Sequence, residues 1–387
     1  MYSIFAKMIL MDRYDNPFML KPYEGRELFC GRADEVGTLV ELLVSGSDVT
    51  LFSPRRMGKT GLILRTFEEI RDRYPDVMTF YVDIFSTRTI EDFNSRLMES
   101  VVTSLRKDSA VRKFFRFMSN LRPTLSFDPV TSEPQVSLTY RDENDRKMTT
   151  EMIFEFLKSL GKKMVIAIDE FQQIRQYPGV EMEAVLRSHI QHLNNIHFVF
   201  CGSRKHLMVE MFTDARRPFY ESTSFLSLRK IPAEVYAPFI KSHFERNGRN
   251  ISDEAVGMIL DWTRRHTFYT QKLCHTIFNI RREYHDRNDV IFAINRIFDE
   301  YEDRFYELRN LVTPAQWNFL KAVAKEGSTD HPMAKDFLLK YNIGTPANAK
   351  RCLMSLLEKE LLLATPHKDG ITYTVYNVFL SRWFESQ

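Results

Sequence analysis

One short stretch restricts the fold of this chain more than any other. Residues 49–53, VTLFS, are apolar enough to form a buried strand, and an amphipathic helix is predicted from about Lys59 to Tyr74. The loop between them, residues 53–60, reads SPRRMGKT and matches the pattern G-x-x-x-x-G-K-[ST] except at its first position, where Ser53 replaces glycine. A glycine-lysine-threonine triplet is common by chance, but one placed between a buried strand and an amphipathic helix is not. The stretch therefore predicts a strand, a tight loop and a helix in direct succession.

The loop has the chemistry needed to hold a chain of phosphate groups. Gly58 lets backbone N–H groups close around phosphate oxygens, and the positive end of the following helix points toward them. Lys59 is expected to bridge the β- and γ-phosphates, and the Thr60 hydroxyl to hold Mg²⁺. Serine at position 53 is expected to cost some backbone strain but to remove no phosphate ligand. The predicted nucleotide-binding loop comprises Ser53, Pro54, Arg55, Arg56, Met57, Gly58, Lys59, Thr60 and Gly61.

A pair of acidic residues follows another apolar strand. In KMVIAIDEFQQI the strand ends at Asp169, which is expected to ligate the metal through water. Glu170 beside it is placed to polarise an attacking water. The alternative interpretation is an acidic helix cap after a strand, but the pairing with the phosphate loop favours catalysis. An acidic pair here also argues for hydrolysis and against a small-molecule kinase.

Further polar positions are candidate catalytic residues. Ser203 ends the apolar run IHFVFCGS and is expected either to hydrogen-bond the γ-phosphate or the attacking water, or to cap the next helix. Arg216 and Arg217, in DARRPFYEST, are candidates for an arginine that neutralises charge in a transition state, and Arg217 is the one we assign. Paired arginines on a loop are more often surface charge. Arg55 and Arg56 are ambiguous in the same way.

Short apolar runs alternate with long amphipathic segments over the first part of the chain. Strands are predicted at residues 49–53, 77–85, 163–169 and 196–203. Because these runs are apolar on both faces and are joined by helical segments, they indicate a parallel sheet in a three-layer α/β domain. Residues 122–145 interrupt the pattern with three prolines and the alternating run QVSLTY. This piece is predicted to be an inserted loop with a short hairpin.

Helices dominate after about residue 226. A capped start is predicted at Ser252, and a long amphipathic helix at residues 290–312. Thr313 and Thr345 each precede a proline at the first position of a helix. The run LLLATPHKDGITYTVY then predicts two strands joined by a turn at Asp369-Gly370. The order helix, helix, helix, hairpin is typical of a winged helix.

Composition excludes several classes of protein. The formal net charge of +3 argues against a strongly basic nucleic-acid protein, although a local basic face is compatible with it. The four cysteines form no metal-binding spacing and indicate small core residues in a reducing cytoplasm. Asp12 and Arg13 interrupt the N-terminal apolar run too early for a secretory signal, and no apolar run is long enough for a membrane helix. We therefore expect a cytoplasmic protein.

The chain resembles the archaeal-type P-loop ATPase family, one of the signal-transduction (STAND) ATPases related to AAA+ proteins. The segment FCGRADEVGTLVELL resembles the F-x-G-R-x-x-E entry segment of the family, SPRRMGKTGL its phosphate loop, and IDEFQQI its I-D-E-x-Q motif. GSRKHLM lies where a G-S-S strand end is usual, and TRRHTFYTQKL is similar to the lid motif G-G-H-P-x-Y-x-Q. The sequence departs from these patterns at Ser53, Arg204, Arg265 and Thr267. The resemblance covers nearly the whole chain.

The resemblance implies a fold and additional nucleotide contacts. The expected fold is α/β: a three-layer P-loop NTPase (AAA+-like) parallel sheet, followed by an all-α lid domain and a C-terminal winged-helix domain. The implied domain bounds are 1–25 for an N-terminal extension, 26–225 for the ATPase core, 226–310 for the lid and 311–387 for the winged helix. Phe29, Gly31 and Arg32 are expected near the adenine, and His266 near the phosphates; helix packing is the alternative role for His266.

Three functions are compatible with these residues. The first is an ATP-hydrolysing switch that acts on a macromolecular partner, with ATP or ADP and Mg²⁺ as cofactors. The second is a DNA-binding regulator in which Asn348, Lys350 and Arg351 of the winged helix face a major groove, although Glu358 and Glu360 follow closely. The third is a nucleotide-binding protein with negligible turnover. An unidentified protein partner and an oligomer fit the first; no membrane association is expected.

Overall fold

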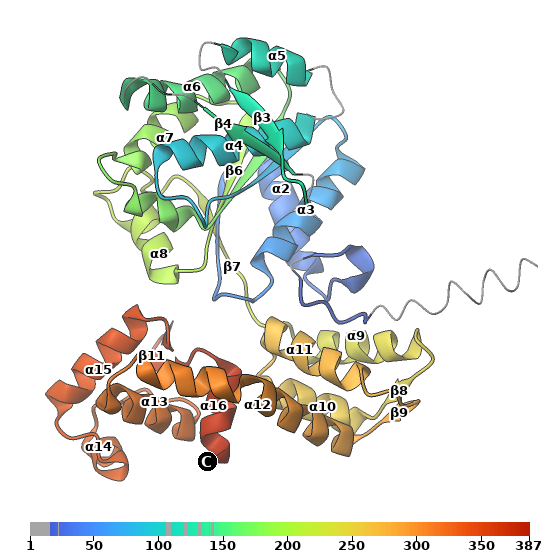
Figure 1. Cartoon of the computed structure of the whole chain (residues 1–387), viewed down its shortest axis with the longest axis vertical. Coiled ribbons are helices and arrows are strands. Elements are labelled where there is room, and N and C mark those ends of the chain that lie inside the picture. The colour runs from blue at the N-terminus through green and yellow to red at the C-terminus, as the bar shows by residue number, and fades with distance from the viewer. Residues whose placement is uncertain are drawn as a thin grey trace, which may run out of the picture. The chain divides into compact units, whose positions relative to one another are not determined.

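The computed structural model describes residues 16–21, 23–105, 110–119, 123–130, 133–138, 140 and 143–387. Within this part the chain divides into two compact units (Figure 1). The first unit is Lys21–Arg229, and the second is Lys230–Gln387 together with residues 16–20.

A parallel sheet of five strands forms the centre of the first unit. The strands are β1 (Val49–Phe52), β2 (Met78–Asp83), β5 (Met164–Asp169), β6 (Ile196–Gly202) and β7 (Ser224–Ser227). Their order across the sheet is β2-β5-β6-β1-β7, and every neighbouring pair is parallel. The parallel sheet and four predicted strands are confirmed. The sequence does not predict β7, because this edge strand has only two apolar residues between two serines and no buried apolar run.

Both faces of the sheet are covered by helices, as its continuous apolar strands require. Because side chains alternate along a strand, Val165 and Ala167 of β5 pack on one side while Ile166 and Ile168 pack on the other. The first side carries α2 (Ala33–Ser45) and α3 (Lys59–Arg73). The opposite side carries α4 (Ile90–Leu105), α5 (Ala110–Phe117), α6 (Glu143–Ser159), α7 (Met182–Ile190) and α8 (Lys205–Thr213).

The parallel arrangement brings three functional segments to one edge of the sheet. β1 ends at the phosphate loop, β5 ends at Asp169, and β6 ends beside Ser203. Ligands bind at this carboxyl edge in open α/β sheets. The sheet therefore supplies the geometry for a site, while the loops supply its chemistry.

A short hairpin lies inside the predicted insertion. β3 (Thr124–Phe127) pairs antiparallel with β4 (Pro134–Ser137). The single-turn helix η2 (Arg26–Leu28) precedes α2, and η4 (Phe171–Gln176) follows the acidic pair.

The second unit begins with helices. These are α9 (Ala233–Glu245), α10 (Asp253–Trp262), α11 (Thr267–Phe278) and α12 (Arg287–Asn310), with the short parallel strands β8 (Asn250–Ile251) and β9 (Tyr284–His285). Ser252 caps α10 as predicted, because its side chain accepts a hydrogen bond from the Ala255 N–H. Most of the predicted N-terminal extension lies outside the described residues. Among the described residues of this extension, Phe18 is buried against Phe244 and Phe278.

The end of the chain has the predicted order of a winged helix. The elements are α13 (Pro314–Glu326), α14 (Lys335–Tyr341), α15 (Pro346–Glu358), β10 (Leu362–His367), β11 (Gly370–Val375) and α16 (Val378–Ser386). Thr313 forms a capping box with Gln316, and Thr345 caps α15. β10 and β11 form the predicted antiparallel hairpin. The final helix α16 was not predicted, although Asn377 caps it and its aromatic side chains are buried.

Two further expectations can be compared with this part of the chain. None of the described helices combines the length and the apolar character needed to cross a membrane. All four cysteines are buried and free of disulfides, as small core residues should be.

Candidate active site

The phosphate loop turns sharply in front of α3. Gly58 precedes the helix with φ of 93°, in the left-handed region that glycine adopts without cost. Arg56 also has a positive φ, 62°, whereas Ser53 does not. Ser53 therefore lacks the left-handed conformation in which the expected strain would arise, whereas Arg56 adopts it. Because Ser53 needs no left-handed conformation, the loop closes without the missing glycine.

The amino end of α3 is suited to an anion. Gly58 supplies no side-chain cap to the first turn of this fully described helix, and the turn contains no acidic residue. Its N–H groups and the positive end of the helix dipole are thus directed toward the loop without an internal carboxylate. Such a helix end is a ready site for phosphate.

Lys59 joins the loop to the acidic pair. Its Nζ lies 2.9 Å from Oδ1 of Asp169 and 3.1 Å from Oε1 of Glu170. The side chains of Lys59 and Asp169 are 8% and 5% exposed, so both charges are largely removed from water. A buried pair of this kind depends on close contacts to offset its desolvation. Here one ammonium neutralises part of the charge on two carboxylates.

The contacts of Asp169 fix both of its oxygens. Oδ2 accepts hydrogen bonds from the Thr60 and Tyr81 hydroxyls, each at 2.8 Å. Oδ1 accepts one from the backbone N–H of Glu170 at 2.9 Å, besides its contact with Lys59. The carboxylate is therefore oriented by α3, by β2 and by its own chain.

Glu170 is held at the end of β5 in a left-handed conformation, with φ of 58°. Its Oε2 accepts hydrogen bonds from Ser203 at 2.8 Å and from the Gln172 amide at 2.6 Å. The Arg55 Nε donates in turn to the Ser203 hydroxyl at 3.4 Å. The predicted residues of the loop, of β5 and of β6 thus form one connected group.

The electrostatics keep both acids ionised. Burial raises the pKa of Asp169, but Lys59 and the donors around it outweigh this effect and hold the pKa below its ordinary value. The pKa of Glu170 is lowered in the same way, by Lys59, Gln172 and Ser203 against burial. Burial alone would lower the pKa of Lys59, yet the two carboxylates raise it. All three groups are charged at neutral pH.

The group has the right ligands for a magnesium-bound triphosphate. A hydroxyl on Thr60 and a carboxylate on Asp169 are oxygen ligands of the kind that Mg²⁺ prefers, and substrate phosphates complete such sites. No cluster of three or more His, Cys, Asp or Glu that could hold a metal occurs among the described residues. The donor set therefore suits Mg²⁺ shared with a nucleotide and not a metal held by protein alone.

Other predicted residues of the first unit lie around the loop or away from it. Arg32 is buried and donates to the carbonyl oxygens of Arg229, at 2.6 Å, and of Met57, at 3.4 Å, so it supports the back of the loop. Phe29 packs edge-on against Tyr23, with ring centroids 5.7 Å apart. Gly31 has φ of 61°. Arg32 and these neighbours therefore shape the chain that enters α2, and their predicted contact with a nucleotide stays a prediction.

Two predicted residues have partners elsewhere. Arg217 pairs with Glu210 at 2.6 Å and with Glu183 at 3.4 Å. His266 belongs to the second unit, where it precedes α11 and packs against Tyr269 with ring centroids 4.6 Å apart. The roles assigned to Arg217 and His266 stay predictions.

Sequence reasoning missed two contacts with the acidic pair. Tyr81 reaches Asp169 because β2 pairs with β5 in a register that places Asp83 opposite Asp169. Gln172 reaches Glu170 because η4 turns back immediately after the acidic pair. The alternation of residues in β2 marked Tyr81, and the I-D-E-x-Q pattern marked Gln172. Neither pattern indicated which residue the side chain would contact.

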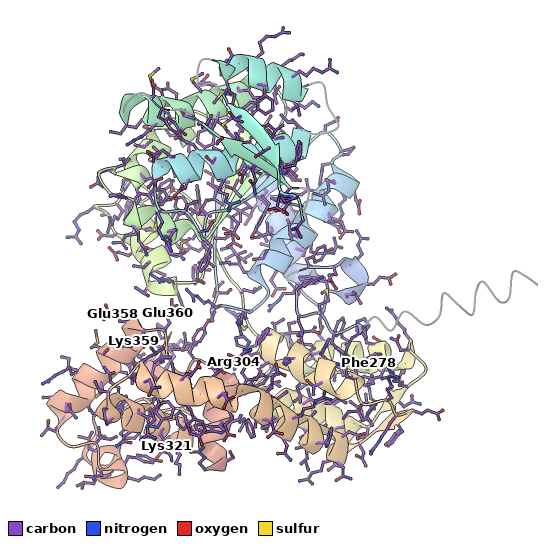
Figure 2. The ribbon with its side chains drawn as sticks, viewed as in Figure 1. Phe278, Arg304, Lys321, Glu358, Lys359 and Glu360 are labelled. Carbon is purple, nitrogen blue, oxygen red and sulfur yellow. The ribbon has the colours of Figure 1, made fainter. Side chains whose placement is uncertain are left out.

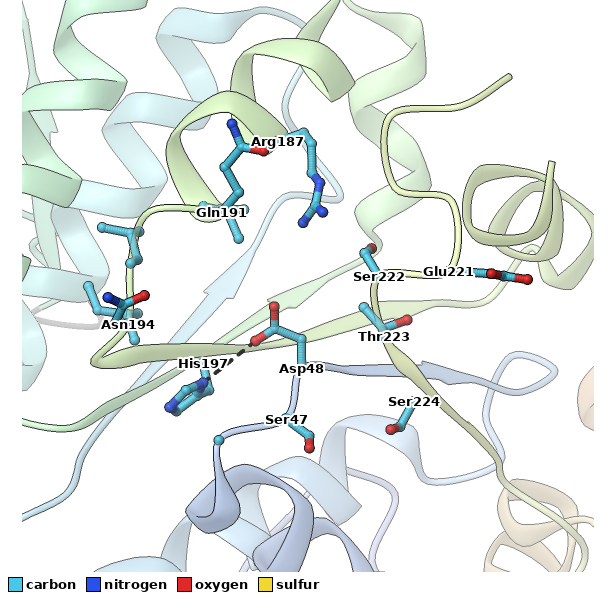
Figure 3. Close-up of a pocket in the computed structure, with 14 residues that line it drawn as sticks. Ser47, Asp48, Arg187, Gln191, Asn194, His197, Glu221, Ser222, Thr223 and Ser224 are labelled. Carbon is cyan, nitrogen blue, oxygen red and sulfur yellow. Dashed lines mark ion pairs between the residues drawn. The ribbon is translucent and has the colours of Figure 1, made fainter. Parts of the chain in front are cut away.

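A second polar hollow lies at the amino edge of the same sheet, where β1, β6 and β7 begin (Figure 3). Its volume is about 600 Å³. Figure 3 shows the Asp48 carboxylate and the Arg187 guanidinium pointing into it from opposite sides, with His197 next to Asp48. The Nδ1 of His197 lies 3.9 Å from Oδ1 of Asp48, which also accepts a hydrogen bond from the Phe198 N–H at 2.8 Å.

Comparisons with known proteins agree with this fold. The family described as "ATPase domain predominantly from Archaea" matches residues 29–264, and a "probable winged helix domain" matches residues 303–386. Comparison with curated proteins gives no match.

Among solved structures, the chain is similar to the Walker-type ATPase PABY2304 of Pyrococcus abyssi. The TM-score is 0.65 at 18% identity, over 95% of this chain and 99% of that one. The ORC2 protein of Aeropyrum pernix, solved with ADPNP and ADP, gives 0.62 at 14% identity over 97% and 96% of the two chains. The ORC1 protein of the same organism, solved with DNA, gives 0.54 at 15% over 96% of each. At such identities the similarity shows the fold alone.

The phosphate loop, the acidic pair and the parallel sheet define a P-loop ATPase with a C-terminal winged helix. The chain belongs to the family of ATPase domains found predominantly in Archaea, which matches more than half of its length. The predicted family and fold class are therefore confirmed, and the family implies that the chain binds a nucleotide.

Proposed function

We propose that this ATPase hydrolyses ATP to ADP and phosphate with Mg²⁺ and acts as a nucleotide-controlled switch on a macromolecular partner. One observation carries the proposal: Lys59 and Thr60, at the head of α3, directly contact Asp169 and Glu170 at the end of β5. A cation, a hydroxyl and two carboxylates in contact are the parts that phosphoryl transfer to water requires.

Each residue has a separate task in this proposal. Lys59 and the N–H groups at the head of α3 bind the β- and γ-phosphates, and Thr60 and Asp169 hold Mg²⁺. The metal supplies neutralisation of the charge that develops on the phosphates. Glu170 accepts a proton from the attacking water, for which its ionised state suits it. Ser203 keeps Glu170 in place through the 2.8 Å hydrogen bond.

A bound nucleotide and the two acidic residues would compete for the ammonium group of Lys59. Lys59 contacts both Asp169 and Glu170 in the structure, and a bound triphosphate competes with them for it. If Lys59 moved from the two carboxylates to the phosphates, the charge at the ends of β5 and β6 would change. We assign to this exchange the first step of the switch, because an electrostatic change at a phosphate site is how nucleotide switches begin.

Arg217 and His266 are the remaining candidates for phosphate contacts. A role of Arg217 as a charge-neutralising finger, from its own chain or from a neighbour in an oligomer, requires it to leave Glu210 and Glu183. For His266, which belongs to the second unit, we propose a contact with the phosphates. Phe29, Gly31 and Arg32 are proposed to line the adenine side. The proposed partner is an unidentified protein in the cytoplasm.

The test combines binding and turnover. Calorimetry with ATP and ADP should show binding to the parent, and Lys59→Ala should weaken it by about tenfold or more, since a hydrogen bond to a charged group is lost. Phosphate release should fall about a hundredfold or more in Glu170→Gln. Lys158→Ala and Glu155→Gln are matched controls, because this pair is 42% and 54% exposed on α6.

Two outcomes contradict the proposal. No heat from either nucleotide, with Lys59→Ala indistinguishable from the parent, removes the site. Binding without measurable phosphate release leaves a nucleotide-binding protein with negligible turnover, and equal release from the parent and Glu170→Gln removes Glu170 from the mechanism.

A DNA-binding regulator is the second candidate, supported by the winged helix and by the fold similarity to an ORC1 protein solved with DNA. Lys350 and Arg351 are exposed on α15, whereas the Asn348 amide donates to the Ile343 carbonyl. Figure 2 shows Glu358, Lys359 and Glu360 together at the end of α15, so the helix carries mixed charge. A gel shift that weakens steeply with added salt would favour this candidate.

A further inference from the structure

We propose that Gln172 is a positioning residue for Glu170: its side-chain amide, together with Ser203, holds one carboxylate oxygen so that the other faces the reacting water once Lys59 turns to the phosphates. This inference rests on the proposed hydrolysis. Gln172 contacts neither of the proposed metal ligands in the structure and acts through Glu170.

The two oxygens of Glu170 are held in different ways. Oε2 accepts from the Gln172 amide at 2.6 Å and from the Ser203 hydroxyl at 2.8 Å. Oε1 accepts from Lys59 at 3.1 Å. Of these donors, Lys59 is the one that a triphosphate attracts. Its departure releases Oε1 while Oε2 stays fixed, which leaves the carboxylate oriented with one free acceptor.

The amide of Gln172 has only one workable orientation. Gln172 is buried, and a flipped amide would place its oxygen against the carboxylate of Glu170, where like partial charges repel. In the observed orientation its Oε1 is buried and has no hydrogen-bond donor among the described residues. A buried acceptor without a partner is unfavourable. The amide therefore keeps its hydrogen bond to Glu170 although its own oxygen accepts none from the described residues.

The end of β6 provides the space for this amide. A Cβ atom built on Gly202 would lie 2.4 Å from Oε1 of Gln172 and 2.4 Å from the Met208 side chain. Real Cβ atoms do not approach so closely, so any larger residue at this position displaces one or both side chains. Glycine at the end of β6 is thus required by Gln172 as well as by Met208.

Removal of the amide should change the rate of turnover and not the binding of ATP. Gln172→Met keeps the length of the side chain but loses the donor. We expect kcat for ATP to fall about tenfold, part of what a general base contributes, with KM within twofold of the parent.

Two further variants and a matched control test the same inference. Gln172→Glu replaces the donor with a second carboxylate beside Glu170 and should lower kcat at least as much as Gln172→Met. Gly202→Ala should imitate Gln172→Met, because it displaces the amide without removing it. Gln173→Met is the control, since Gln173 is also buried in η4 but donates to the Thr87 carbonyl at 3.0 Å. It should leave kcat within twofold of the parent.

The outcomes separate this inference from the proposed function. If Glu170→Gln abolishes turnover while Gln172→Met keeps kcat within twofold of the parent, Gln172 does not position Glu170 and the proposed function stands. Equal losses of kcat in Gln172→Met and Gln173→Met would assign both to folding and overturn the inference. A parent without turnover overturns both.

Discussion

Two aspartates at opposite edges of one sheet differ in what surrounds them. Asp169, at the carboxyl end of β5, lies 2.9 Å from the Lys59 ammonium and accepts hydrogen bonds from two hydroxyls. Asp48, just before β1, accepts one backbone N–H at 2.8 Å and faces the Arg187 guanidinium across a hollow. The pKa of Asp169 is lowered, whereas that of Asp48 is raised to about 6.

The contrast shows that a cation and hydrogen-bond donors in contact decide the sign of the pKa shift when both carboxyls are buried. Burial is the largest influence at each aspartate and raises the pKa of both. At Asp169 the Lys59 ammonium in contact, together with the Thr60 and Tyr81 hydroxyls, outweighs burial; at Asp48 the Phe198 N–H and the charge of Arg187 do not. Opposite charges attract in inverse proportion to their separation, so a cation beyond contact distance compensates less for lost water. Ionisation of the carboxyl therefore favours the folded state at the carboxyl edge and disfavours it at the amino edge.

The largest expected effect comes from removing the cation at the carboxyl edge. Lys59→Met leaves Asp169 and Glu170 side by side without their common partner, so the free energy of unfolding of the nucleotide-free protein at pH 7 should fall by about 3 kcal/mol. The carboxylate pKa values lose their depression, and the loss should shrink as the pH falls and the acids become protonated. Urea denaturation at pH 7 and pH 5 measures both effects.

Lys158→Met is the control for this experiment, because Lys158 pairs with Glu155 on an exposed surface. Exposed pairs contribute little to stability. If Lys59→Met and Lys158→Met destabilised the protein equally, the contact at the carboxyl edge would have no special weight, and the contrast between the two aspartates would fail.

The second prediction concerns Asp48 and has the opposite sign. A carboxyl with a raised pKa in the folded state binds its proton more tightly than in the unfolded chain, so stability falls as the pH rises from about 4 to about 6 and stays low above it. The shift from 3.8 to about 6 corresponds to at most about 3 kcal/mol. Asp48→Asn keeps an oxygen for the Phe198 N–H but carries no charge. It should raise the free energy of unfolding at pH 7.5 by about 1–2 kcal/mol.

The measurement is urea denaturation of the parent and Asp48→Asn at several pH values between 4 and 7.5. The two curves should converge near pH 4, where the parent carboxyl is protonated. Asp76→Asn is the control, because Asp76 is exposed, and it should change the free energy of unfolding at pH 7.5 by no more than about 0.5 kcal/mol. A destabilised Asp48→Asn at pH 7.5 would mean that the ionised carboxylate is favourable, contrary to the comparison.

The sequence anticipated the carboxyl edge far better than the amino edge, for physical reasons. Lys59, Thr60, Asp169 and Ser203 each follow an apolar strand, and parallel strands bring their carboxyl ends together whatever the details of packing. Each of these residues can therefore be recognised from the sequence around it, although the site combines residues that are distant along the chain. Tyr81 and Gln172 depend on register and on the path of η4, which apolar periodicity does not encode.

The hollow at the amino edge has no local pattern at all. Asp48 lies in the turn after α2, and Arg187 lies in α7, so only the folded chain brings them to one hollow. β7 was missed for a related reason: its position beside β1 comes from pairing with a buried strand and not from its own apolar content. What the sequence could not predict is, in each case, a property of neighbours distant along the chain.

The smallest expected effect comes from the cation that faces Asp48 from a distance. The charge of Arg187 lowers the pKa of Asp48, though by less than burial raises it. Arg187→Gln should therefore raise that pKa further, and the pH at which the fall in stability ends should move upward. Because the interaction crosses a solvated hollow, the change at pH 7.5 should be a few tenths of a kcal/mol and should vanish in about 1 M salt, where the Debye length is about 3 Å. The carboxyl carbon resonance of Asp48, followed by NMR, reports the midpoint directly. A midpoint that falls instead, or a shift that survives high salt, would mean that Arg187 acts on Asp48 by packing and not by charge. This distinction tests whether Arg187 acts on Asp48 by charge from a distance, whereas Lys59 acts on Asp169 in contact.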